Sequence, residues 1–203
     1  MKAYPSIPLS TDSRSIGEPC IGFYKYDGSN LRWEWSKKQG WHKFGTRTRL
    51  FGKDEEPYNQ AIPLFLETMG DALISKVTAN FHVQDFIVYT EFFGESSFAG
   101  AHVLNEPKSL ILLDVWIPRK SFILPKQFIK LFSNESWMPE VVYEGNLNQK
   151  LIKDVYEGKY NLDEGMMCKG FDKRQQQWMA KIKTKTYLDK LKTKYGEGWE
   201  KMI

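Results

Sequence analysis

Hydrophobic and polar residues alternate, or apolar residues cluster, along several short stretches of the chain, and this pattern predicts β-strands. The stretches are 20–26, 31–35, 41–49, 85–93, 109–117, 164–169 and 177–183. The first three follow one another with only short polar turns between them, so we expect an antiparallel meander at the start of the sheet. The last two are joined by the turn signal Asp172-Lys173-Arg174.

Apolar residues at helical spacing predict helices between these strands. The helical stretches are 56–76, interrupted by Pro63, and 126–132, 147–156 and 186–195. Residues 1–18 carry prolines and little periodicity, and we interpret them as a lead-in segment. Since no repeat or linker divides the chain, residues 1–203 are expected to form a single α+β domain with antiparallel sheets flanked by helices.

The composition is that of a folded protein with a sizeable core, because 41% of the 203 residues are hydrophobic and 15% are aromatic. No apolar run approaches the length of a membrane span, and no secretory signal opens the chain. We therefore expect no membrane association and a cytoplasmic location, in the host cytoplasm if the source is viral. Cys20 and Cys168 fit no metal or disulfide spacing, so reduced thiols are expected.

Positive charge gathers near the end of the chain. The net charge of +4 is modest, and it permits a nucleic-acid partner without requiring one. From Lys181 to Lys201, however, seven lysines face three acidic residues. The basic helix over 186–195 is therefore a candidate contact for nucleic acid.

The tetrapeptide Lys25-Tyr26-Asp27-Gly28 is the first candidate for chemistry. A lysine can act as a covalent nucleophile when its pKa is lowered or when a metal ion shields the charge of an incoming phosphate. The alternative is a strand that ends in an Asp-Gly turn with Lys25 in solvent. The tetrapeptide alone does not decide between them.

Two further segments carry polar residues with a possible role in nucleotide binding. Arg47 and Arg49 are expected on one strand face, where they would grip phosphate or ribose oxygens or simply face solvent. Glu91 lies in an apolar run, where it would accept from a ribose hydroxyl, hold metal-bound water or form a structural salt bridge. His102 is a lone loop histidine, which is more often structural than catalytic.

The last two predicted strands carry charges at regular positions. Glu164 and Lys169 are the polar ends of a short apolar strand, suited to a divalent ion and to a phosphate. Lys181 and Lys183 share one strand face because side chains alternate with a period of two. Two neighbouring lysines repel each other, and a triphosphate would supply the counter-anion. The alternative is a basic edge strand that protects against aggregation.

In this order, the motifs resemble those of the covalent nucleotidyltransferase superfamily, which contains ATP-dependent DNA ligases, RNA ligases and mRNA-capping guanylyltransferases. The resemblance spans roughly residues 20 to 184. Within it, Lys25-Tyr-Asp-Gly-Ser-Asn and Glu91-Phe-Phe-Gly look most like the phage RNA ligases that seal nicks and repair RNA. The resemblance implies a nucleotidyltransferase (ATP-grasp-like ligase) fold. It also implies an activity that joins the 5′-phosphate and 3′-hydroxyl ends of nucleic acid, with RNA favoured over DNA.

The resemblance also implies roles for the residues of the first motifs. Lys25 would attack the α-phosphorus of ATP, expelling pyrophosphate and leaving a lysyl-AMP. Asp27 and Asn30 would shape the ribose and phosphate environment. Arg47 would contact the ribose or the end of the nucleic acid, and Glu91 would bind the ribose.

For the later motifs, the resemblance implies that Glu164 positions Mg²⁺, or Mn²⁺ in its place, through the water shell of the ion. Lys169, Lys181 and Lys183 would stabilise negative charge on the α-phosphate. AMP would then pass to a nucleic-acid 5′-phosphate and leave when a 3′-hydroxyl attacks.

This chain departs from the superfamily pattern at three places. Leu113 occupies the position of the aromatic residue that stacks on the base, and Tyr24 replaces the carboxylate that precedes the lysine. The chain continues for only about twenty residues after Lys183, too few for an oligonucleotide-binding barrel of roughly 70 or more residues. We therefore expect a minimal ligase or one that uses a partner protein. The alternatives are a GTP-using capping-type enzyme, a minimal DNA ligase and a degenerate nucleic-acid-binding domain.

Overall fold

The computed structural model describes residues 1–95, 105–174 and 176–202, so His102 lies outside the described residues. The chain divides into two compact units. Met1–Pro5 and Asp27–Pro139 form one, here the six-stranded unit, and Ser6–Tyr26 and Glu140–Ile203 form the other, the four-stranded unit. The boundary at Tyr26 falls inside the Lys25-Tyr26-Asp27-Gly28 motif. Each unit is described separately below.

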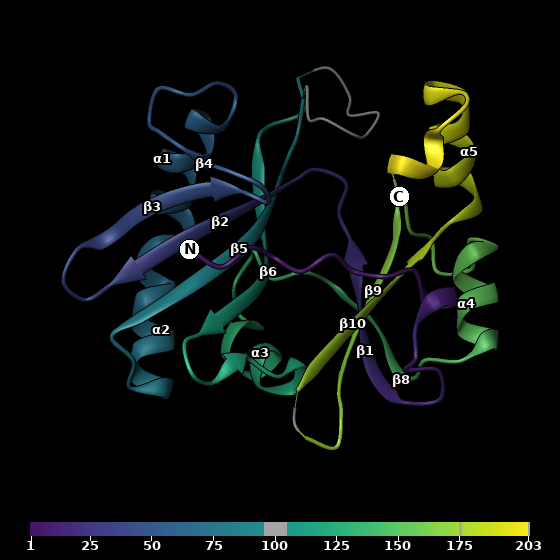
Figure 1. Ribbon diagram of the computed structural model, residues 1–203, viewed down its shortest axis with the longest axis horizontal. Coiled ribbons are helices and arrows are strands. Elements are labelled where there is room, and N and C mark those ends of the chain that lie inside the picture. Colours follow the sequence, from purple (N-terminus) through teal and green to yellow (C-terminus); the bar gives the residue numbers. More distant parts are fainter. Residues whose placement is uncertain (96–104, 175, 203) are drawn as a thin grey trace. The chain divides into compact units, whose positions relative to one another are not determined.

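The six-stranded unit is built on an antiparallel sheet with the strand order β4-β3-β2-β5-β6-β7 (Figure 1). Its strands are β2 (Ser29–Ser36), β3 (Gly40–Thr46), β4 (Leu50–Phe51), β5 (Asp85–Phe93), β6 (Ser109–Ile117) and β7 (Ser121–Phe122). The bounds of β5 and β6 are those that the hydrophobic pattern predicts. β2 and β3 form the expected antiparallel pair.

The helical segments of this unit are a 3₁₀ turn (Tyr58–Gln60), α1 (Ala61–Phe65), a π-helical turn (Leu66–Gly70), α2 (Asp71–Phe81) and α3 (Pro125–Phe132). The predicted interruption at Pro63 is wrong, because this proline lies in the first turn of α1, where backbone N–H groups need no helical partner. The irregularity comes instead at Leu66–Gly70.

One face of the six-stranded sheet is apolar and packs against the helices. The ring of Trp33 in β2 stacks on Phe65 of α1, with ring centroids 4.1 Å apart. The indole N–H of Trp33 donates to Oγ1 of Thr90 at 2.9 Å, so its one polar group is satisfied inside the core. The other face carries polar residues that alternate along the strands with the apolar ones, among them Asn30 and Arg32 of β2 and Glu91 of β5.

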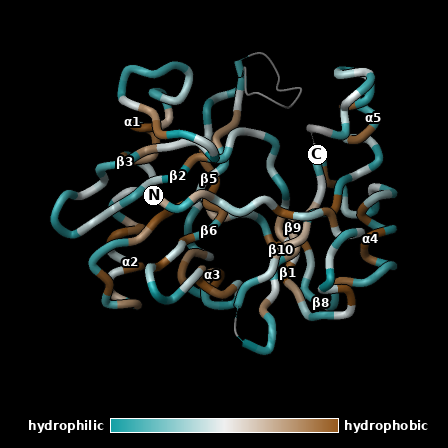
Figure 2. The backbone as a smooth tube through the Cα atoms, viewed as in Figure 1, coloured by the Kyte–Doolittle hydropathy of each residue, from teal (hydrophilic) through white to brown (hydrophobic). Residues whose placement is uncertain are grey.

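The four-stranded unit has the strand order β10-β9-β1-β8, again antiparallel. Its strands are β1 (Pro19–Lys25), β8 (Val141–Asn146), β9 (Gly165–Phe171) and β10 (Gln177–Lys183). Its helices are α4 (Gln149–Tyr156) and α5 (Lys185–Tyr195), with short 3₁₀ turns at Ser10–Asp12 and Trp199–Met202. Figure 2 shows hydrophobic stretches along the strands of both sheets and hydrophilic residues in many of the connections.

The core of this unit lies between α4 and one face of the sheet. Leu151 and Val155 of α4 pack with Cys168, Ala180 and Ile182 of the sheet. Ala180 and Ile182 therefore face the core, as the alternation predicts, and Lys181 and Lys183 face the other side. Cys20 and Cys168 are buried free thiols, as expected.

The predicted opening meander is wrong for its first strand. β1 does not continue into β2 but pairs with β8 and β9 from the end of the chain. Local alternation predicts that a strand exists, whereas its partners are decided by packing across the chain. Gly28 lets the backbone pass close to that of Phe92, since a Cβ at position 28 would lie 2.4 Å from the carbonyl oxygen of Phe92.

Residues 1–18 contribute buried side chains to both units. Tyr4 is buried in the six-stranded unit, with its ring 4.8 Å from that of Tyr89. Ile7 and Ser10 are buried in the other unit, where Leu9 forms a parallel bridge with Lys181. Within the described ranges, no helix has the length and apolar character needed to cross a membrane.

Candidate active site

Lys25 and Lys183 flank one glycine in the four-stranded sheet. Lys25 of β1 lies opposite Gly165 of β9, and Gly165 lies opposite Lys183 of β10. Residues directly opposite each other in an antiparallel sheet point to the same face. The two lysines therefore leave the sheet on the same side, on either side of a position that has no side chain.

Glu164 joins these two lysines. Its Oε1 and Oε2 lie 2.7 and 2.8 Å from Nζ of Lys25, and its Oε1 also contacts Nζ of Lys183. The carboxylate is 2% exposed and Lys183 is 6% exposed. A buried carboxylate is costly unless cations compensate it, and here two ammonium groups do so.

Burial lowers the pKa of Lys183 to about 8, and the positive charge of Lys25 lowers it further against the opposing effect of Glu164. The ammonium also lies 4.4 Å from the ring centroid of Tyr187 in α5, a favourable position for a cation. The pKa of Lys183 therefore lies below the usual range of a lysine.

The backbone around Glu164 is adapted to this arrangement. Gly165 has φ +156°, and a Cβ there would lie 1.9 Å from the carbonyl oxygen of Ile182, so no other residue fits. The carbonyl of Glu164 accepts from the backbone N–H of Thr184 at 3.1 Å. The Glu164-Gly165 pair therefore anchors the start of β9 against the end of β10.

Two further predicted lysines lie on the same face of this sheet. Lys169 lies opposite Ile21, and Lys181 lies opposite Met167, at even spacing from Gly165 and Lys183. Lys169 is buried, with Nζ 5.1 Å from the ring centroid of Phe23. The structure thus brings together Lys25, Glu164, Lys169, Lys181 and Lys183 on one sheet. The counter-ion of Lys183 in this protein is Glu164, so this lysine does not need a triphosphate to balance its charge.

In the six-stranded unit, Asn30 and Glu91 lie opposite each other on β2 and β5. Glu91 is 8% exposed. Both amide atoms of Asn30, Nδ2 and Oδ1, are buried and find no hydrogen-bond partner among the described residues. Such an amide is costly and is commonly satisfied by water or ligand.

Arg32 is a cation in this unit that the sequence reasoning missed. It is 6% exposed, its Nη1 donates to the carbonyl of Met1 at 3.2 Å, and its Nε has no partner among the described residues. Its stem fits because Gly45 lies opposite, where a Cβ would come 2.9 Å from Nε. The sequence could have indicated Arg32, because side chains in a strand alternate with a period of two and Arg32 therefore lies on the same face as Asn30.

The predicted pairing of Arg47 and Arg49 on a strand face is wrong. β3 ends at Thr46, and both arginines lie in the exposed turn that leads to β4. The backbone N–H of Thr46 donates to the carbonyl of Arg49 at 2.8 Å and closes this turn. Arg49 pairs with Glu55. The strand-like sequence pattern continues beyond Thr46, although the hydrogen bond between Thr46 and Arg49 closes a turn there.

Leu113 and Asp27 lie at irregular points of the six-stranded unit. Tyr89 lies opposite Asp114 while Thr90 lies opposite Leu112, so Leu113 is the extra residue of a β-bulge. Bulges re-aim a side chain, and Leu113 is partly buried. Asp114 accepts from the hydroxyl of Tyr4. Asp27 is partly buried and is the first residue of this unit after Tyr26.

Within the described ranges, no three His, Cys, Asp or Glu side chains gather as a dedicated metal site. Glu164 is the carboxylate of the lysine cluster. This fits Mg²⁺, which keeps several waters and is bound through one or two carboxylates together with substrate phosphates. Glu164 would hold such an ion, and the ion would neutralise phosphate charge.

Comparison with known proteins gives fold relatives but no sequence relatives. No protein-family model matches the sequence, and no curated protein matches it. Among solved structures, Naegleria gruberi RNA ligase with PPi has a TM-score of 0.67 and 14% identity, over 95% of this chain and 58% of that chain. A mutant of the same ligase with ATP and Mn has a TM-score of 0.66 and 15% identity, over 93% and 58%.

A DNA ligase structure is similar as well. The putative ATP-dependent DNA ligase from Aquifex aeolicus has a TM-score of 0.60 and 18% identity, over 95% of this chain and 53% of that chain. The chain thus spans between half and two thirds of the length of these proteins. The α+β class with antiparallel sheets flanked by helices is confirmed. The chain therefore shares the fold of these RNA and DNA ligase structures.

Proposed function

We propose that this protein is an ATP-dependent RNA ligase that forms a lysyl-AMP on Lys25 and joins 5′-phosphate to 3′-hydroxyl ends. The observation that carries the proposal is the contact of Lys25 and Lys183 with the buried Glu164. Attack on a phosphate anion needs a nucleophile together with positive charge that is already in place. The fold shared with ligase structures supports the same activity.

In the first step, Nζ of Lys25 loses a proton to Glu164 or to solvent and attacks the α-phosphorus of ATP. The N–P bond forms as the bond to the pyrophosphate oxygen breaks, in line with the attack. Glu164 holds Nζ of Lys25 within the cluster before nucleotide binds. Lys183, Lys181 and Lys169 stabilise the charge that develops on the α-phosphate.

Divalent metal supplies additional positive charge when it is bound, with Glu164 holding it through water. In the six-stranded unit, Asn30 and Glu91 have the donors and acceptors that ribose hydroxyls need, and Asp27 contributes to the same environment. Leu113 would pack on the base. Arg47 would contact the ribose or the nucleic-acid end.

AMP then passes from Lys25 to the 5′-phosphate of the nucleic acid, and a 3′-hydroxyl displaces it. Lys190 and Lys194, exposed on α5, offer positive charge to the RNA backbone. The preference for RNA rests on the Lys25-Tyr26-Asp27-Gly28-Ser29-Asn30 motif. Because a DNA ligase shares the fold, sealing of DNA nicks is the competing activity.

The test has two parts. The protein is incubated with α-labelled ATP or GTP and Mg²⁺ or Mn²⁺, and the product is separated on a denaturing gel. We expect label from ATP only. Label from GTP only would replace the ligase by a capping-type enzyme, and nucleic-acid binding without any label would indicate a degenerate binding domain.

The second part measures sealing of matched RNA nicks, DNA nicks and single strands. We expect sealing of RNA ends with release of AMP. Sealing of DNA nicks alone would make the protein a minimal DNA ligase, and labelling without sealing would point to a missing partner protein.

A further inference from the structure

Tyr24 precedes the proposed nucleophile, and its side chain points to the opposite face of β1 from that of Lys25. Its hydroxyl donates to Oδ2 of Asp163 at 2.6 Å and accepts from the backbone N–H of Asp163 at 3.3 Å. Asp163 is the residue just before Glu164. The two hydrogen bonds therefore join the strand of Lys25 to the segment of Glu164.

Thr184 holds the same segment from β10. Its hydroxyl donates to the carbonyl of Asp163 at 3.0 Å, and its backbone N–H donates to the carbonyl of Glu164 at 3.1 Å. Thr184 directly follows Lys183 and is the N-cap of α5, where its hydroxyl accepts from the backbone N–H of Tyr187 in the first turn. Asp163 and Glu164 are thus tied to the residue before Lys25 on one side and to the residue after Lys183 on the other.

We propose that Tyr24 is a positioning residue that, together with Asp163 and Thr184, sets the place of Glu164 relative to Lys25 and Lys183. This inference rests on the proposed lysine adenylylation. Burial and the bond to Asp163 both raise the pKa of Tyr24, so its hydroxyl stays protonated and keeps donating at neutral pH. Since that hydroxyl is committed to Asp163, it does not read the base. The position before the lysine serves the catalytic cluster in this chain.

The two hydrogen bonds between Tyr24 and Asp163, here called the Tyr24–Asp163 clamp, predict a specific effect on the labelling rate. Tyr24→Phe removes only the hydroxyl and should slow labelling at saturating ATP about 10-fold, because misplacement of a catalytic group lowers the chemical step. The KM for ATP should change less than about 2-fold, since no nucleotide contact is removed. Asp163→Ala should have a similar effect, and the double variant should be no slower than the single ones, because both changes break the same bond.

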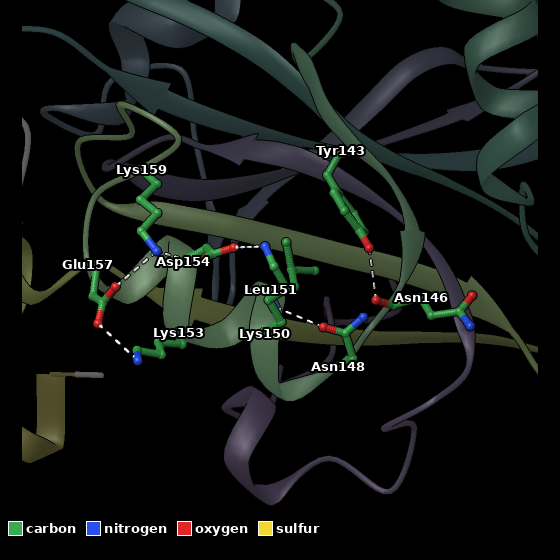
Figure 3. Close-up of polar contacts among 9 residues, drawn as sticks. All are labelled: Tyr143, Asn146, Asn148, Lys150, Leu151, Lys153, Asp154, Glu157 and Lys159. Atoms are coloured by element: carbon green, nitrogen blue, oxygen red, sulfur yellow. Dashed lines mark hydrogen bonds and ion pairs between the residues drawn. The ribbon is translucent and has the colours of Figure 1, made fainter.

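Tyr143→Phe is the matched control. Tyr143 lies on β8 of the same sheet, and its hydroxyl donates to the carbonyl of Asn146 at 3.0 Å (Figure 3). This variant also removes one tyrosine hydroxyl and one hydrogen bond, away from Glu164. Its labelling rate should equal that of the unaltered protein.

Amide hydrogen exchange gives a readout that does not need activity. The amides of Asp163 and Thr184 should exchange several-fold faster in Tyr24→Phe than in the unaltered protein, and no faster in Tyr143→Phe. Unchanged exchange would show that Tyr24 does not hold the segment. Faster exchange with an unchanged labelling rate would refute its role in positioning Glu164 for the reaction. If the unaltered protein takes no label from any nucleotide, the proposed function fails, and exchange still decides whether the clamp exists.

Discussion

Each sheet carries a cluster of polar side chains, and the two clusters differ in how many of their charges and hydrogen-bonding groups are paired within the protein. In the four-stranded unit, Glu164 contacts both Lys25 and Lys183, so charges compensate charges without ligand. In the six-stranded unit, the amide of Asn30 and Nε of Arg32 are buried without a hydrogen-bond partner among the described residues. The first arrangement already has positive charge in place, as the proposed reaction requires, and the second has bonding capacity left for a ligand or water.

This contrast predicts different outcomes for substitutions in the two clusters. A residue of the compensated cluster supports both folding and reaction, so its removal exposes charges that no longer balance. A residue with unused bonding capacity contributes little to folding, so its removal should act on ligand binding alone. The predictions that follow test this difference, beginning with the largest expected effect.

Lys25→Ala should abolish covalent nucleotide attachment completely, because it removes the nucleophile. Lys25→Arg should fail as well, since a guanidinium stays protonated and cannot attack. The measurement is labelling with α-labelled ATP followed by a denaturing gel. An acid-labile adduct that persists in Lys25→Ala would identify a different nucleophile.

Glu164→Ala should lower the free energy of unfolding by about 3 kcal/mol, because it leaves two ammonium groups next to each other without a counter-ion. Urea unfolding followed by circular dichroism measures this change. The exposed Glu157, which pairs with Lys153 and Lys159 (Figure 3), provides a control. Glu157→Ala should cost no more than about 1 kcal/mol. Equal losses for the two variants would contradict a special role of Glu164 in the cluster.

Lys183→Ala should slow labelling at least ~10-fold, as expected when a positioned phosphate cation is lost. In the unaltered protein, the labelling rate at low ATP should fall as pH rises through about 8, the lowered pKa of Lys183. Lys183→Arg should remove this fall because arginine stays charged. A rate that stays level well above pH 8 would mean that the charge of Lys183 is not used.

The same pKa also predicts a change in stability. Between pH 8 and 10.5 the unfolded chain holds more protons at Lys183 than the folded one, so this residue makes stability rise with pH in that window. Urea unfolding at several pH values should show a smaller rise for Lys183→Met than for the unaltered protein. Parallel curves would contradict the lowered pKa.

Asn30→Ala should give the smallest change in folding and a selective change in binding. Because the amide makes no hydrogen bond among the described residues, its removal breaks none of them, and the free energy of unfolding should not fall by more than about 0.5 kcal/mol. The KM for ATP in the labelling reaction should rise about 5-fold, the value of one hydrogen bond. A large loss of stability with an unchanged KM would reverse the comparison between the two clusters.

Much of the fold was predictable because strand and helix patterns are local. The predicted bounds of 85–93, 109–117 and 177–183 agree with β5, β6 and β10. The partners of β1 were not predictable, because they come from the end of the chain. The turn after Thr46 was missed for a related reason, since strand-like composition continues through it.

For the candidate site, alternation alone put Lys181 and Lys183 on one face, because side-chain direction in a strand follows a period of two. The resemblance carried by the order of the motifs made Lys25 and Glu164 candidates. The structure decided that these two residues, 139 positions apart, form a hydrogen bond. It also decided that Glu164 bridges Lys183 and that Tyr24 holds Asp163. Register between strands from distant parts of a chain depends on how the whole sheet packs, and no local pattern contains it.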